Sequence, residues 1–551
     1  MLIKSSTDMR KIITLFCFFC VAIGVIASDT LCVKETQIPI LIERKDNVLF
    51  YLRMDASECK RLDKVVLRFG EETALNNIKV VKLYYGGTEC VQREKTQGFA
   101  PVAYISRDIP GKTREANPSY SVKLDEKTVS SKDITFSVNR ELFQGINYFW
   151  ISLELESDVL ITQKITALVV SAVADGKLIP IAMHSPKNSV HRMGVGVRHA
   201  GDDGSAAYRI PGLVTTNKGT LLGVYDIRYN NSADLQEYVD IGVSRSTDKG
   251  QTWEPMRVAM SFGETGGLPK AQNGVGDPAI LVDRQTGTIW VIAAWTHGMG
   301  NGRAWFNSRQ GMDKAQTAQL MLVRSDDDGQ TWSEPVNITE QVKDPSWSFL
   351  LQGPGMGITM QDGTLVFAAQ FINEDRDPHS CIIYSKDRGQ TWHLHNAPRE
   401  NTTEAQVAEV EPGVLMLNMR DDRGGSRAVY ITKDMGRTWE KHPSSRSVLR
   451  EPVCMASLIK SEAKDNVLGK DILLFSNPNT VKGRNHMTIK ASLDGGLTFP
   501  GEYQLMIDEG DGWGYSCLTM IDRETVGILY EGSTAHMVFQ AIPLKEIVRS
   551  K

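Results

Sequence analysis

Eight polar residues in the second part of the chain have the types and positions to do chemistry. They are Arg209, Arg228, Asp234, Asp277, Glu404, Arg420, Arg484 and Tyr515, each in or beside an apolar, β-prone run. A charged side chain is rarely buried unless it is paired, so each one taken singly is best interpreted as a solvated loop charge or a structural ion pair. Taken together, they combine arginines that grip anions bidentately with carboxylates and a phenol that can exchange protons.

The elements that must position these residues are marked by an octet of the form S-x-D-x-G-x-T-W. Its copies place Asp248, Asp327, Asp387, Asp434 and Asp494 at intervals of 79, 60, 47 and 60 residues. Repeats of this length are typical of four-stranded β-propeller blades. We expect a hairpin tip in which Asp accepts from backbone amides two residues on, Gly takes positive φ and the aromatic packs between neighbouring sheets. The octet therefore indicates how the chain folds, not what it does.

Apolar runs between the octets predict one strand per blade, buried on both faces. These inner strands are expected at 221–226, 289–296, 365–370, 414–418, 471–476 and 526–530. Six strands against five octets favour six blades, the last of them without an octet. A strand around 193–198 would complete that last blade and leave no open edge. The eight polar residues would then converge on the mouth of the central channel.

The first part of the chain carries no octet. Short runs rich in Val, Ile, Tyr and Phe predict a β-sandwich, and they lie at 48–54, 64–69, 78–85, 120–124, 134–138, 148–155 and 164–172. The predicted fold is all-β, a six-bladed β-propeller preceded by a smaller β-sandwich domain. Its predicted boundaries are 28–182 for a carbohydrate-binding-like sandwich, 183–200 for a linker and 201–551 for the propeller. The sandwich is equally well interpreted as a sugar-binding module or as a packing partner of the propeller.

The N-terminus predicts export. Basic residues precede an apolar run over 12–27, and Val25 and Ala27 suit a cleavage site, so residues 1–27 are interpreted as a signal peptide. The run of 16 residues is shorter than the ~20 needed to span a bilayer, and we expect no stable membrane span. The expected location is periplasmic, cell-surface or secreted.

Composition argues against several classes of function. The net charge of −4 and the lack of a Lys/Arg run disfavour a nucleic-acid partner. A length of 551 residues is too great for one core. The cysteines that follow the predicted signal are sparse and have neither disulfide-framework nor zinc spacing. With no metalloprotease, P-loop or nucleophile-elbow motif in the sequence, we expect neither a metal nor an organic cofactor.

One family shares these features. Tyr-Arg-Ile-Pro at 208–211, followed by the repeated octets, resembles the bacterial exo-α-sialidases (neuraminidases) over roughly 190–545. An acid in the first blade, the segment T-E-A-Q-V-A-E at 403–409 and a tyrosine near the end follow in the family's order. The first domain resembles the β-sandwich modules that some bacterial sialidases carry ahead of the propeller.

This resemblance implies an arginine triad that grips the carboxylate of the substrate. Arg209, Arg420 and Arg484 would form it. Sialic acid carries its carboxylate on the anomeric carbon, and a guanidinium group matches that anion bidentately and keeps its charge. Arg423 and Arg427 lie close to Arg420 in the sequence and are alternatives for its place.

The resemblance also implies the residues that react. Tyr515 would be the nucleophile and Glu404 its general base, because a neutral phenol avoids the repulsion that the substrate's anion would exert on a carboxylate. Asp234 would protonate the leaving oxygen; burial would raise its pKa and nearby arginines would lower it, and the sequence leaves open which prevails. Arg228 and Asp277 would line the pocket on the side of the 4-hydroxyl and the N-acyl group.

The implied function is that of an exo-α-sialidase. It would hydrolyse terminal α-ketosidically linked sialic acid from glycoproteins, glycolipids such as gangliosides, and oligosaccharides, with retention through a tyrosyl intermediate. A trans-sialidase on the same fold and a non-catalytic sugar-binding propeller are the alternatives. The octet does not separate them, but a lectin has no need of a Tyr–Glu pair.

Overall fold

A computed structural model describes residues 29–88, 121–184, 190–300 and 302–549. The predicted signal peptide lies outside these described residues. Within them the chain is all-β. Its α-helices are single turns, α1 (Ala304–Asn307), α2 (Thr339–Val342) and α3 (Leu544–Ile547). No helix in the described ranges is long and apolar enough to cross a membrane.

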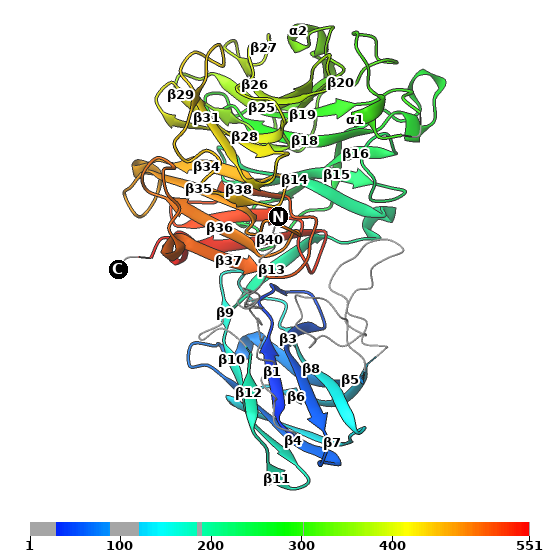
Figure 1. The fold of residues 1–551 in the computed structure, drawn as a ribbon, viewed down its shortest axis with the longest axis vertical. Helices are drawn as coiled ribbons and strands as arrows, with labels where there is room; N and C mark the ends of the chain where they lie inside the picture. The colour runs from blue at the N-terminus through cyan, green and yellow to red at the C-terminus, as the bar shows by residue number, and fades with distance from the viewer. Residues whose placement is uncertain (1–28, 89–120, 185–189, 301, 550–551) are drawn as a thin grey trace, which may run out of the picture.

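Two sheets make up the first part of the chain, blue and cyan in Figure 1. One has the order β12 (Ile181–Met183), β1 (Leu31–Glu35), β3 (Asn47–Ala56), β8 (Gly145–Leu155), β5 (Ile78–Gly87) and β6 (Val122–Thr128). The other has the order β11 (Lys177–Leu178), β10 (Ala167–Ala174), β4 (Arg61–Phe69) and β7 (Asp133–Glu141). Each apolar run predicted here overlaps a strand. Alternating burial along β7 turns Ile134, Phe136 and Val138 inward onto one core shared by both sheets.

The second part of the chain contains six larger sheets, green to red in Figure 1. The first three are β14 (Ala207–Thr215), β15 (Leu221–Arg228), β16 (Val239–Ser246), β17 (Arg257–Met260); then β23 (Gly355–Met356), β18 (Val275–Val282), β19 (Ile289–Trp295), β20 (Gln319–Ser325), β21 (Val336–Asn337); then β22 (Phe349–Gln352), β25 (Leu365–Ile372), β26 (Pro378–Ser385), β27 (His393–Leu394), with β24 (Ile358–Thr359) on β25.

The remaining three sheets follow the same plan. They are β28 (Thr402–Glu411), β29 (Val414–Asp421), β31 (Ala428–Thr432), β32 (Glu440–Lys441); then β34 (Ser457–Ser461), β35 (Ile472–Pro478), β36 (Met487–Ser492), β37 (Gln504–Asp508); then β38 (Ser516–Met520), β39 (Thr525–Tyr530), β40 (Met537–Pro543), β13 (His191–Arg198), β2 (Ile40–Leu41), with β9 (Lys164–Ile165) on β13. A small pair joins β30 (Gly425–Ser426) to β33 (Arg450–Glu451).

The six predicted inner strands are β15, β19, β25, β29, β35 and β39. Each occupies the second place in its sheet when β23, which adds to the edge of the second sheet beside β18, is left out of the count. Each is hydrogen-bonded on both sides and buried on both faces, which explains the continuous apolar runs. The strands that meet between sheets are the preceding ones: β14 contacts both β18 and β38, and β34 contacts both β28 and β38. The polar residues on these first strands therefore approach one another from different sheets.

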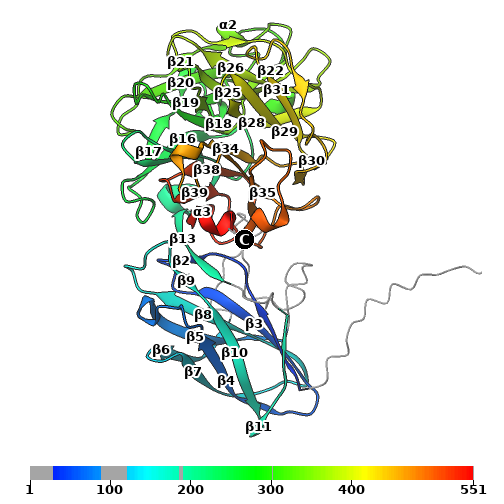
Figure 2. The same cartoon turned by 90° about the vertical axis from the view of Figure 1, so that its left-hand side faces the viewer.

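Strand β13 joins the two parts of the chain, as the turned view shows (Figure 2). It pairs antiparallel with β40, and this pairing confirms the strand predicted at 193–198. Strand β13 therefore lies inside the stretch predicted as a linker, 183–200. It also pairs with β2 and β9 from the first part of the chain. The core of the first part continues into the second through Tyr208, Leu213 and Phe539.

Each octet forms the turn between the third and fourth strands of its sheet. In the sixth sheet the fourth strand, β13, precedes the first sheet in sequence. No turn links it to β40, so this sheet has no place for an octet.

Hydrogen bonds within the octet correct one expectation. The carboxylate of Asp248 accepts from the backbone N–H and the hydroxyl of Thr252, at 2.9 and 2.6 Å, so its amide partner is four residues on rather than two. Ser246 donates to Asp248, and the N–H of Gly250 donates to Ser246, both at 2.8 Å. The two left-handed residues Lys249 and Gly250 turn the chain back so that Thr252 faces the carboxylate. The other four octets repeat this pattern.

Packing between sheets is as expected for the first octet. The ring of Trp253 meets Phe539 of the neighbouring sheet at 5.2 Å between centroids. A Cβ atom added to Gly250 would collide with the same phenyl ring, so glycine is required for space as well as for its φ of 89°.

Candidate active site

A cavity of about 300 Å³ lies where the first strands converge. Its polar lining includes Asp234, Asp277, Glu404, Arg420 and Tyr515. Asp277 is on β18, Glu404 on β28 and Arg420 on β29, while Tyr515 immediately precedes β38. Residues from four different sheets, counting the loop after β15, thus meet in one cavity.

Apolar residues also line the cavity. They are Leu235, Trp305, Phe306, Phe349 and Leu351. Trp305 packs edge-on against Phe349 at 5.8 Å between centroids. A ligand in this cavity therefore meets both charged groups and aromatic rings.

Tyr515, Glu404 and Arg420 form a compact hydrogen-bonded group. The hydroxyl of Tyr515 donates to Oε1 of Glu404. Nη1 of Arg420 donates to Oε2 of Glu404 at 2.7 Å and to the hydroxyl of Tyr515 at 3.2 Å. Burial, reinforced by the charge of Glu404, raises the pKa of Tyr515 well above its ordinary value, although Arg420 and Arg484 oppose the shift. The phenol is therefore protonated at rest, with its proton directed at a carboxylate.

Two further guanidinium groups flank the ring of Tyr515. Those of Arg209 and Arg484 lie 5.4 and 5.6 Å from its centroid. Arg484 is oriented by the carbonyl oxygens of Trp513 and Val453, each at 3.0 Å. The structure thus brings the three arginines of the expected triad around one tyrosine.

Glu531 was not among the residues predicted from the sequence. It is buried directly after β39 and accepts from Nε of Arg209 at 2.6 Å. It also accepts from the N–H of Ile210 and the N–H of Tyr515, both at 3.0 Å. Burial tends to raise the pKa of Glu531, but the opposing effect of Arg209 and of these hydrogen bonds is greater, so the pKa lies below its ordinary value. A charged residue directly after an apolar run was the only signal in the sequence.

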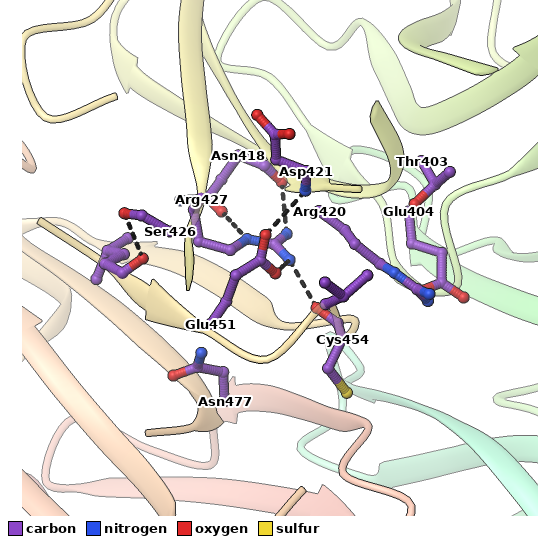
Figure 3. Close-up of polar contacts among 12 residues, drawn as sticks. Thr403, Glu404, Asn418, Arg420, Asp421, Ser426, Arg427, Glu451, Cys454 and Asn477 are labelled. Carbon is purple, nitrogen blue, oxygen red and sulfur yellow. Dashed lines mark hydrogen bonds and ion pairs between the residues drawn. The ribbon is translucent and has the colours of Figure 1, made fainter. Parts of the chain in front are cut away.

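The structure distinguishes Arg420 from the two alternatives near it (Figure 3). The guanidinium of Arg427 binds Glu451 at 2.9 Å and the carbonyl oxygen of Cys454 at 2.7 Å, whereas Arg420 binds Glu404. Arg423 is partly exposed and binds Glu400. Arg420 is the arginine beside Tyr515.

Asp234 lies within 4.0 Å of three arginines, Arg228, Arg209 and Arg303. Its side chain is 49% exposed, and its Oδ1 accepts from Nη1 of Arg228 at 2.9 Å, with Nη1 of Arg209 at 4.0 Å. Burial tends to raise the pKa of Asp234, but the opposing effect of Arg228 and then Arg209 is greater, so the pKa lies below its ordinary value. The sequence left open whether burial or nearby arginines would set this pKa, and in the structure the arginines prevail.

Arg228 and Asp277 occupy different environments. Arg228 is 1% exposed and lies behind Asp234, held by Asp226 at 2.8 and 3.0 Å, rather than in the cavity lining. Asp277 lines the cavity, and its backbone N–H donates to Asp226 at 2.8 Å. Burial and the charge of Asp226 raise the pKa of Asp277 well above its ordinary value, which favours its protonated form. Across the described ranges there is no cluster of three or more His, Cys, Asp or Glu suited to a metal ion.

Comparison with known proteins gives the family. A model of the N-terminal domain of BNR-repeat neuraminidase matches residues 28–178, and one of a BNR repeat-like domain matches 210–502. A sialidase from Bacteroides fragilis is 64% identical over 97% of this chain and 98% of its own length. The chain belongs to the sialidase family. The present chain also matches the solved structure of Hadza microbial sialidase Hz136, with a TM-score of 0.89 and 62% identity. The match covers 93% of the present chain and 99% of Hz136. A Clostridium perfringens sialidase is 34% identical over 60% of this chain and 87% of its own.

Proposed function

We propose that this sialidase releases terminal α-ketosidically linked sialic acid from sialylated glycans, with retention at the anomeric carbon. The candidate substrates are glycoproteins, glycolipids such as gangliosides, and oligosaccharides. The observation that carries the proposal is the Tyr515 hydroxyl, which donates to Glu404 inside a ring of three guanidinium groups.

The arginines account for recognition. The carboxylate of sialic acid would bind to Arg209, Arg420 and Arg484 around Tyr515. Glu531 and the carbonyl oxygens of Trp513 and Val453 hold two of these arginines in place before any substrate arrives. Preorganised guanidinium groups bind a carboxylate without further ordering of their own side chains.

The Tyr–Glu pair accounts for bond cleavage. As the Tyr515 oxygen attacks the anomeric carbon, its proton passes to Glu404, and the glycosidic oxygen leaves with a proton from Asp234. Water then attacks the anomeric carbon of the tyrosyl-linked sugar, while Asp234 takes a proton from that water. The Tyr515 oxygen leaves and recovers its proton from Glu404. The two inversions give net retention.

The low pKa of Asp234 fits its role as the base in the second step. For the first step it must be protonated. A substrate carboxylate bound at Arg209 would offset one of the charges that lower the pKa of Asp234, and would raise it. Substrate binding would thereby prepare the acid that the reaction needs.

We also infer the architecture in finer detail. The six sheets of residues 191–549 would be the blades of a six-bladed propeller, with β13 as the outer strand of the sixth. Their support is the repeated four-strand order and the contacts of the first strands. Residues 28–182 would form the β-sandwich domain and 201–551 most of the propeller, with the predicted connection at 183–200 supplying β13 to the sixth blade. The two separate sheets of the first part and the family matches over 28–178 and 210–502 support this division.

We propose that the chain is exported and lies in the periplasm, at the cell surface or in the medium. The support is the basic N-terminus followed by the apolar run over 12–27. N-terminal sequencing of protein from the producing cells would then begin near Ser28. A mature chain that starts at Met1 would contradict it.

A fluorogenic α-sialoside tests the activity. The purified protein is expected to release the fluorophore, and NMR of the first sugar formed is expected to show the α-anomer. No release between pH 4 and 8 would refute the proposal. A β-anomer as the first product would still show sialidase activity, but it would refute the retaining mechanism through a tyrosyl intermediate.

A further inference from the structure

An ion pair between Arg427 and Glu451 lies near Arg420, outside the cavity lining, and takes no part in the reaction described above (Figure 3). Arg427 and Glu451 are both 0% exposed, and Nη1 of Arg427 donates to Oε2 of Glu451 at 2.9 Å. Burying two charges is costly unless all their hydrogen-bonding groups are used, and removing one partner leaves an uncompensated charge.

One set of contacts leads to Arg420. Oε1 of Glu451 accepts from the N–H of Asp421, the next residue in β29, at 2.8 Å. Nε of Arg427 donates to the side-chain oxygen of Asn418 at 2.7 Å, and Nη2 donates to its backbone carbonyl at 3.1 Å. Asn418 and Asp421 bracket Arg420 in sequence, so the pair fixes the strand on both sides of it.

The other set of contacts leads to Arg484 and Tyr515. Nη1 of Arg427 also donates to the carbonyl oxygen of Cys454 at 2.7 Å. The preceding carbonyl, that of Val453, accepts from Arg484 at 3.0 Å, and Val453 has a positive φ of 54°. Cys454 packs in one buried cluster with Tyr515. A β-branched residue at positive φ needs its surroundings to hold it there, and Arg427 supplies part of that hold.

We propose that Arg427 and Glu451 are positioning residues that set the separation of Arg420 and Arg484, and so the fit of the site to a carboxylate. The pair connects β29, which carries one arginine, to the segment at 451–454, which orients the other and supports Tyr515. Neither residue reaches the cavity. The inference rests on the function proposed above, in which these two arginines bind the substrate's carboxylate.

The test compares Glu451→Gln with the wild-type full chain. Inhibition of fluorophore release is measured with free sialic acid and with its methyl ester, which keeps the sugar but lacks the charge. We expect the wild-type preference for the acid over the ester to fall about tenfold or more in Glu451→Gln, because a displacement near 1 Å is enough to spoil a bidentate contact. A loss of folding alone would lower the amount of active protein. It would leave the inhibition constants of both compounds, and so the preference for the acid, unchanged.

A matched control is the buried pair of Arg245 and Asp328, at 3.1 Å and 8% side-chain exposure each; Asp328 lies within the second octet. Asp328→Asn is expected to lower the melting temperature and to leave the acid-to-ester preference unchanged. A Glu451→Gln protein that behaves like this control would overturn the inference.

Asn418→Ala covers the case in which Glu451→Gln does not fold. It removes one acceptor from Arg427 and leaves both charges in place, and we expect a smaller fall in the same preference. An unchanged preference in this variant also overturns the inference. A wild-type protein that neither hydrolyses the sialoside nor binds sialic acid would instead refute the proposed function.

Discussion

The octets and the active site both depend on carboxylates with several hydrogen-bond donors, but the donors come from different distances in sequence. Asp248 is satisfied by Ser246 and Thr252 within its own octet. Glu404 is held by Arg420 from the next strand and by Tyr515, which is 111 residues away. A self-contained arrangement can be copied from sheet to sheet. One that needs several sheets at once can exist only where they converge.

The two regions also differ in electrostatics. Partial burial raises the pKa of Asp327 in the second octet, but hydrogen bonds from Thr331 and Ser325 outweigh it and lower the pKa to about 2. At the site, burial and neighbouring carboxylates raise the pKa of Tyr515 and Asp277. The octets stabilise charge that is already present, whereas the site holds protons that can be moved.

The largest effect is expected at the tyrosine. Tyr515→Phe removes the attacking oxygen, and turnover should fall about a thousandfold or more, while free sialic acid still binds to the arginines. Steady-state kinetics and a binding isotherm for sialic acid measure the two quantities. Turnover near that of the wild type would show that another residue is the nucleophile.

A smaller loss is expected at the acid. Asp234→Asn should reduce kcat about a hundredfold on a sialyl-oligosaccharide, whose leaving oxygen needs a proton, and much less on an aryl sialoside with a good leaving group. Parallel kinetics on the two substrates measure the difference. Equal losses on both would place Asp234 in binding rather than in proton transfer.

An octet carboxylate should affect stability and not catalysis. Asp327→Ala removes the acceptor of Thr331 and Ser325, and we expect the free energy of unfolding to fall by about 1–3 kcal/mol, with unchanged turnover per folded molecule. Denaturant melts and kinetics on the same samples measure both. The neighbouring exposed Asp326→Ala is the control and should change stability by no more than about 0.5 kcal/mol. A selective loss of turnover in Asp327→Ala would remove the distinction between the two regions.

The smallest expected effect is the change with pH in the stability difference between the wild type and Asp327→Ala. The folded pKa of Asp327, about 2, is below the ~3.9 of an unfolded Asp. Its ionised form therefore stabilises the fold fully above about pH 5, and this contribution is lost as the pH falls from 4 towards 2. The gap in melting temperature between wild type and Asp327→Ala should narrow over that range. A gap that widens as the pH falls would mean that the carboxylate is not stabilised by its octet.

Prediction from the sequence succeeded for local features and for residues next to recognisable motifs. The strands around 221–226 or 526–530 follow from apolar runs, because a strand hydrogen-bonded on both sides has no solvent-facing side chain. The sequence singles out the eight candidate residues, and the structure brings Arg420, Glu404 and Tyr515 into contact. The amide partner of the octet aspartate was misjudged by two residues, since two consecutive left-handed residues were not foreseen.

Glu531 and Glu451 were missed for a shared reason. Each is a buried carboxylate whose partners belong to other strands: Arg209 for Glu531, Arg427 and Asp421 for Glu451. In the sequence such a residue looks like any surface glutamate, because burial and partner depend on which strands pack together. The same is true of Arg427, which sequence spacing could not separate from Arg420.

The all-β character, the octet turns and the family resemblance could be predicted from the sequence, because these depend on residues within a few positions of one another. Which of three nearby arginines faces Tyr515, and whether burial or arginine charge sets the pKa of Asp234, follow from the tertiary structure alone. Those outcomes depend on distances between side chains that are far apart in the chain. Electrostatic and hydrogen-bond energies vary with such distances and with burial, and neither is fixed until the sheets converge.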